Sequence, residues 1–160
     1  MRIPIRVLKR LPVSRGLVAR IQDLERQVQD TARFDAVLNQ VLTLHGSMPM
    51  PPANLRMRVG GTPSPVEFLE VGRNCMTDIE KSLPVKGQGL ERFARILDFG
   101  CGCGRTLRWF DIQEVRGPQL HGCDIDGEAI EWCRLHMGQR FTFQHVAPVP
   151  PTPYTDNQFD

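Results

Sequence analysis

The chain has 160 residues, of which 41% are hydrophobic and 24% are charged, and its formal net charge is only +2. This length gives room for one ordinary domain with some extension, and the small net charge argues against the broad basic surface that nucleic acid requires. Because no apolar run reaches the roughly 18 residues that span a bilayer, and five irregularly spaced cysteines predict no disulfide framework, we expect a cytoplasmic protein with reduced thiols and no transmembrane segment.

The N-terminal part is predicted to be a basic tail, residues 1–15, followed by an amphipathic helix over residues 16–46. Residues 1–22 hold six basic residues and no acidic one, a pattern that usually belongs to a solvated tail. In the helix, four apolar residues at 4-3-4 spacing share one face: Leu17, Ile21, Leu24 and Val28. The pattern is too short for a stable coiled coil, but we expect this helix to be able to self-associate.

A segment rich in proline and glycine, residues 47–64, is predicted to be a linker. A helix with a well-marked start follows it. Ser64 is placed to cap that helix, Pro65 occupies its first position, and Glu67 stands three residues after the cap. The apolar period continues to Leu83, and Pro84 is expected to end the helix.

Strand and helix patterns alternate over the last part of the chain. Short apolar runs predict buried parallel strands over residues 96–99, 119–124 and 141–144. Helices are predicted from residue 106 and over residues 127–137, the second capped by Asp126. The fold class is therefore α/β, a Rossmann-like doubly wound sheet represented by its first three strands in the order 3-2-1. We assign residues 65–160 to this partial domain.

A glycine loop follows the first strand, with glycines at Gly100, Gly102 and Gly104. Such a turn lets the backbone approach a ligand closely. The dinucleotide pattern G-x-G-x-x-G would need glycine where Arg105 or Leu107 stands, which disfavours a nicotinamide oxidoreductase, and no phosphate-binding Gly-Lys-Ser/Thr follows. Asp124, at the end of the second strand, is placed to accept hydrogen bonds from a ribose.

These features together resemble class I S-adenosylmethionine-dependent methyltransferases. Residues 96–110 are similar to the family's motif I, residues 121–126 to its motif II, and residues 151–160 to the segment leading into its fourth strand. The resemblance covers about residues 67–160 and implies S-adenosyl-L-methionine as cofactor. It also implies roles for six residues: the methionine part of the cofactor lies against Asp98, Gly100, Gly102 and Gly104, the ribose hydroxyls bind Asp124, and the adenine packs on Ile125.

Two departures from the family limit what the resemblance implies. Many members carry an acidic residue after the third strand, where this chain has Gln144 and His145. His145 either lines the adenine site or is an exposed loop histidine. The family's later strands supply most of the acceptor pocket and the catalytic side chains, so no catalytic residue is assigned. Since Asp160 precedes that fourth strand, we expect a C-terminally truncated chain whose first strand is an exposed edge.

The sequence leaves two functions open. The first is a methyltransferase acting on an unidentified acceptor, which we expect to be a small molecule rather than nucleic acid. The second is a non-catalytic S-adenosylmethionine-binding or regulatory module that a partner chain completes. No metal site is expected, because the cysteine spacings around Cys101 and Cys103 match none of the usual zinc arrangements.

Overall fold

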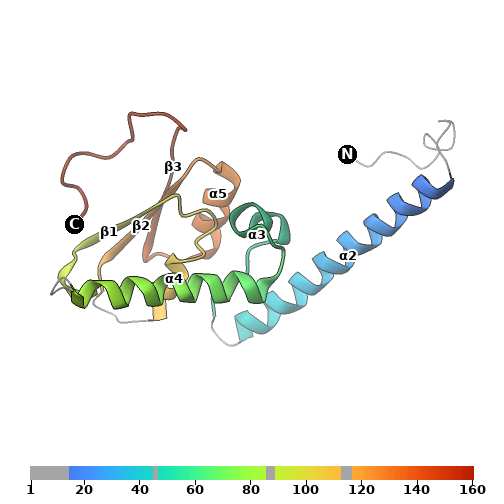
Figure 1. Ribbon diagram of the computed structural model, residues 1–160, viewed down its shortest axis with the longest axis horizontal. Helices are drawn as coiled ribbons and strands as arrows, with labels where there is room; N and C mark the ends of the chain where they lie inside the picture. Colours follow the sequence, from blue (N-terminus) through green and yellow to red (C-terminus); the bar gives the residue numbers. More distant parts are fainter. Residues whose placement is uncertain (1–14, 45–46, 86–88, 113–116) are drawn as a thin grey trace.

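The computed structural model describes residues 15–44, 47–85, 89–112 and 117–160, so most of the predicted basic tail lies outside the described residues. Its centre is a sheet of three parallel strands, β1 (Arg95–Phe99), β2 (Gln119–Asp124) and β3 (Phe141–His145), in the order β1-β2-β3 (Figure 1). Arg95 pairs with Gln119, and Leu120 pairs with Phe141. The predicted α/β class and the partial Rossmann-like sheet are confirmed.

Helix α5 (Gly127–His136) covers one face of the sheet and buries Ala129, Ile130 and Cys133. It begins where the sequence predicts, because the Asp126 carboxylate accepts hydrogen bonds from the backbone N–H groups of Glu128 and Ala129, each over 3.1 Å. This cap fixes the turn between β2 and α5, which is the turn that carries the motif II residues.

Helix α4 (Pro65–Val85) and the short 3-10 helix η2 (Leu107–Ile112) pack together beside the sheet. Ser64 caps α4, its hydroxyl accepting from the Glu67 N–H over 3.3 Å. The two helices come very close at Gly72, where a Cβ would lie 2.7 Å from the Trp109 indole nitrogen. The helix that we expected from residue 106 is present as this short 3-10 helix, which begins at Leu107.

The N-terminal part of the chain forms the helices α2 (Arg15–Leu44) and α3 (Ala53–Gly60). Helix α2 extends away from the body of the domain (Figure 1). The sequence did not predict α3, which lies inside the expected linker. Its signal was present: a proline, Pro52, precedes its first residue, and Gly61 ends it with a left-handed φ of 72°.

Helix α3 is joined to α2 by a buried ion pair. Arg56 is 1% exposed and donates to the Asp35 carboxylate over 2.9 Å, to the Pro63 carbonyl over 2.6 Å and to the Pro51 carbonyl. Leu55 beside it is also buried. Residues 47–64 are therefore not a plain linker. Their prolines place carbonyl groups around a buried guanidinium, which composition alone does not reveal.

The C-terminal segment returns from β3 to the start of β1 (Figure 1). The Asp160 N–H donates to the Arg95 carbonyl over 3.1 Å, and its carboxylate accepts from the N–H groups of Ala94 and Arg95, both over 2.8 Å. These bonds lower the pKa of Asp160. Among the described residues β1 remains the edge of the sheet, and Phe99 is 68% exposed.

A membrane-crossing helix was sought among the described residues, and none there has the necessary length and apolar character.

Candidate functional site: a glycine loop at the carboxyl ends of the strands

The loop between β1 and η2 is pinned to the end of β2 by its own backbone. The N–H groups of Gly100 and Cys101 both donate to the Cys123 carbonyl, over 2.8 and 3.0 Å. Gly100, Gly102 and Gly104 all have positive φ, at 84°, 53° and 74°, a region that favours glycine. A Cβ built on Gly100 would meet no atom within 4 Å, so this glycine presents bare backbone to open space.

Asp124 connects the glycine loop to the motif II turn. One carboxylate oxygen accepts from the Gly102 N–H over 2.7 Å, and the other accepts from the Asp126 N–H over 2.8 Å. An ionised carboxylate offers about four acceptor positions. Two of them hold the protein backbone, and the remainder are free to accept from a diol. The ligand-binding role of Asp124 stays a prediction from the sequence, which did not predict that this carboxylate shapes the loop.

Ile125 and His145 lie together beside Asp124. The Ile125 side chain is 61% exposed. The His145 Nε2 lies 3.1 Å from the Ile125 carbonyl oxygen, to which the Nε2–H tautomer donates. Its ring also lies 3.5 Å from where a Cβ on Gly127 would stand. His145 is thus exposed, as one of the two readings from the sequence expected, and it packs against the turn that presents Ile125; the reading that it lines an adenine site stays a prediction.

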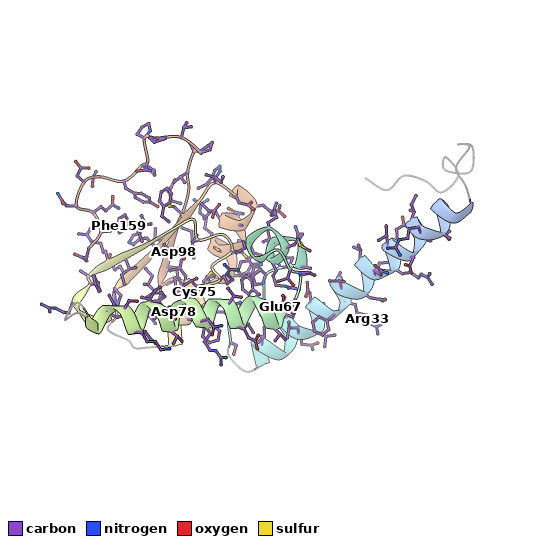
Figure 2. All side chains as sticks on the ribbon, in the orientation of Figure 1. Arg33, Glu67, Cys75, Asp78, Asp98 and Phe159 are labelled. Atoms are coloured by element: carbon purple, nitrogen blue, oxygen red, sulfur yellow. The ribbon has the colours of Figure 1, made fainter. Side chains whose placement is uncertain are left out.

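Asp98 gives the site a second carboxylate, close to the first. Figure 2 shows it in the body of the domain, in projection between Phe159 on the C-terminal segment and Cys75 on α4. Burial raises the pKa of Asp98, the Asp124 carboxylate raises it further, and Arg105 opposes both. Two acidic groups and one basic group therefore give this end of the sheet a net negative charge when all are ionised.

Buried thiols support the loop from beneath. The Sγ atoms of Cys101 and Cys133 each lie 3.6 Å from the Gly102 carbonyl oxygen. Burial raises the pKa of both thiols, and it raises the pKa of Cys103 to about 11. All five cysteines are free, and no group of three potential metal ligands occurs within the parts of the chain that the structure describes. Protonated thiols of this kind fill space rather than react.

Helix α3 forms a wall of the loop that the sequence did not predict. A Cβ on Gly102 would lie 2.5 Å from a methyl group of Val59, so only glycine lets this helix come so close. Arg58 pairs with Asp126 over 3.1 Å and with Glu128 over 2.7 Å at the first turn of α5. Below the loop, the Arg108 guanidinium donates to the Pro49 carbonyl over 2.6 Å. The sequence signal for this helix was Pro52 before its first residue and Gly61 after its last.

Comparison with known proteins agrees with this geometry. Residues 97–160 match a family described as a methyltransferase domain, a segment that runs from within β1 through β2, α5 and β3. The resemblance to class I S-adenosylmethionine-dependent methyltransferases is therefore confirmed for these 64 residues, and all six candidate residues lie within them. No curated protein and no solved structure matched the chain in the same comparison.

Proposed function

We propose that the chain binds S-adenosyl-L-methionine at the glycine loop and forms the cofactor-holding part of an enzyme that methylates a small molecule. The observation that carries this proposal is Asp124, which ties the loop to the end of β2 beside the exposed Ile125. A carboxylate with free acceptor positions next to an apolar side chain suits a nucleoside. The bare backbone at Gly100 leaves room for the rest of the ligand.

The charges of the site suit this cofactor better than a dinucleotide. S-adenosylmethionine carries a sulfonium, an ammonium and a carboxylate, hence a net charge of +1, whereas a dinucleotide carries an anionic pyrophosphate. When all three are ionised, Asp98, Asp124 and Arg105 sum to −1. Opposite net charges attract across a partly buried site, and a pyrophosphate would be repelled by the same carboxylates.

The chemistry requires the protein mainly to hold two reactants in line. When bound, the cofactor would supply a methyl group on a cationic sulfur, for transfer to the electron pair of an acceptor. The contribution of this chain is positional: Asp124 and Ile125 hold the nucleoside end, and the glycine loop with Asp98 holds the amino-acid end. Fixing the donor in this way removes an entropic cost that can be large.

Calorimetric titration with S-adenosylmethionine, S-adenosylhomocysteine and NAD tests the proposal. We expect heat and a saturable isotherm with the first two ligands and none with NAD. Binding of NAD alone would favour an oxidoreductase, and no binding of either adenosyl ligand would refute the proposal. Binding of the adenosyl ligands with no methyl transfer to any of a broad acceptor panel would favour the second function, a non-catalytic module.

We also propose that α2 associates with a second copy of itself. Its exposed apolar side chains support this: Leu24, Val28, Phe34 and Val37 are between 45% and 68% exposed. A groove of about 760 Å³ between α2 and α3 includes Leu24, Val28 and Met57 in its lining. Sedimentation over a range of concentrations should show reversible dimers that Val28→Glu abolishes. A cytoplasmic location is likewise a proposal, supported by the five free cysteines.

A further inference from the structure

Helix α2 has two parts with different surroundings. Its inner part packs on the domain, where Asp35 is buried and paired with Arg56 of α3. Its outer part, residues 15–30, extends away from the domain (Figure 1). Leu24 and Val28 of this outer part are 45% and 68% exposed. The helix therefore exposes large apolar side chains beyond the part that packs on the domain, which is the usual mark of a contact surface.

The groove between α2 and α3 begins within this outer part. Along α2 its lining extends from Leu24 to Asn39, and the opposite wall is made by α3 with the prolines on either side of it. Met57 on the α3 wall is 46% exposed. A groove between two helices, lined largely by apolar side chains, is a common binding site for the apolar face of a third helix.

The outer part of α2 has the kind of face that such a groove accepts. Ile21, Leu24 and Val28 are three and four residues apart, so they lie on one side of the helix. From Leu24 the outer part runs toward the start of α2, and the groove runs the other way. Two antiparallel copies can therefore each lay an outer part along the groove of the other, which gives the same contact twice, as in a two-fold dimer. Parallel copies would leave both grooves open.

The charges along the chain favour a second copy as the partner and an antiparallel arrangement. Residues 23–30 contain three acidic residues and one basic residue, whereas a helix that lies on anionic lipid has a basic polar face. Residues 1–22 contain six basic residues and no acidic one. Parallel copies would bring two such segments together, where like charges repel. Antiparallel copies separate them.

We propose that the chain forms an antiparallel dimer in which the outer part of each α2 lies in the groove between α2 and α3 of the other copy. This inference rests on the self-association proposed above, and it adds the orientation of the helices and the contribution of α3. If the middle of each outer part faces the middle of the partner's groove, the Gln40 residues of the two copies lie on the order of 40 Å apart, at 1.5 Å of rise per residue.

A substitution on the α3 wall distinguishes this arrangement from contact between the two outer parts alone. Met57→Glu places a carboxylate where the docked helix would bury it without a partner, so sedimentation should show a dimer at least about tenfold weaker. The matched control is Val71→Glu on α4, outside the groove lining, since Val71 is 40% exposed against 46% for Met57. It should leave the dimer unchanged. Equal effects of the two variants, or none from either, would overturn the inference and leave the self-association standing.

A distance between spin labels tests the orientation without a change in the groove. Gln40 is exposed, and Cys75→Ser removes the cysteine that is not buried, so Gln40→Cys in that background gives one accessible label per chain. Electron paramagnetic resonance should give a distance on the order of 40 Å. Parallel helices, whose axes are about 8–10 Å apart, would give less than about 20 Å and would overturn the inference.

A wild-type chain that stays monomeric at every concentration would overturn the proposed self-association as well. If that monomer also sediments with vesicles of anionic lipid, the exposed face of α2 binds a membrane and not a second copy.

Discussion

The contact between Gly102 and Val59 can be tested by adding one methyl group. Gly102→Ala places a Cβ 2.5 Å from one Val59 methyl carbon and 3.2 Å from the other, at a φ of 53°. Val59→Ala removes both methyl groups and leaves only the Val59 Cβ, 3.4 Å away, which is an ordinary contact. The two substitutions should therefore interact strongly, because one removes the obstacle that the other meets.

The expected cost is the sum of two terms. Holding alanine in the left-handed region costs about 1–2 kcal/mol, and forcing a methyl group into a packed contact costs about 1–3 kcal/mol. Gly102→Ala should thus lower the free energy of unfolding by about 2–5 kcal/mol in the wild-type background. In the Val59→Ala background only the backbone term of about 1–2 kcal/mol should remain, so the coupling energy should exceed about 1 kcal/mol.

Urea unfolding of the four chains in the double-mutant cycle measures this coupling. Gly100→Ala is the matched control, because its φ of 84° carries the same strain while its Cβ would meet nothing. The cost of Gly100→Ala should be independent of residue 59. If Gly102→Ala costs the same amount in both backgrounds, helix α3 does not rest on the glycine loop and the packing argument is wrong.

Three further predictions concern single positions. Asp98→Asn should raise the melting temperature at neutral pH and weaken cofactor binding. The pKa of Asp98 is raised in the folded chain, so the stability of the wild type rises as the pH falls through that pKa. Thermal scans across pH should therefore show the difference in melting temperature between variant and wild type shrinking at low pH. Ile125→Ala should leave the free energy of unfolding within about 0.5 kcal/mol but weaken the binding of S-adenosylhomocysteine about fivefold through lost apolar contact. Leu135→Ala on α5 is the control, since Leu135 is 70% exposed against 61% for Ile125, and it should change neither quantity. Arg56→Met should destabilise the chain by about 3–5 kcal/mol in urea unfolding, because it leaves the Asp35 carboxylate without its buried partner; a loss below about 1 kcal/mol would contradict the role given to this pair.

The sheet was predictable from the sequence because its signals are local. Asp126 caps α5, Gly138 follows it, and a short apolar run marks each strand. The apolar period and the residues that begin and end each element are therefore enough to predict these elements. Helix α3 was missed for the opposite reason. Its stability comes from Arg56 reaching Asp35, 21 residues earlier, and from Leu55 entering the core. The proline and glycine content of residues 47–64, which led us to predict a linker, says nothing about these long-range contacts.

The candidate site divides in the same way. The types and spacing of Asp98, the glycines and Asp124 predicted that these residues would form one loop at the carboxyl ends of the first two strands, and the structure brings them together there; the binding of a nucleoside stays a prediction. Their mutual contacts were not predictable, because the bond from the Gly102 N–H to Asp124 and the packing of Val59 join residues far apart in the chain. Nor could the sequence show that the buried Nε of Arg105, the residue that stands where the dinucleotide pattern needs a glycine, has no hydrogen-bond partner among the residues that the structure describes.

Because α3 packs against the glycine loop, the segment that matches the family is shorter than the segment that packs around the loop. The family pattern begins at residue 97, but the body that gives the loop its shape begins near Met50, which is 1% exposed in the core. An expression boundary drawn at residue 65 would keep every recognisable motif. It would also remove Val59 from Gly102 and Arg58 from the start of α5, and it would expose the Arg108 guanidinium that now binds the Pro49 carbonyl. Such a fragment would retain the sequence of the candidate site and lose the helix that packs against its glycine loop.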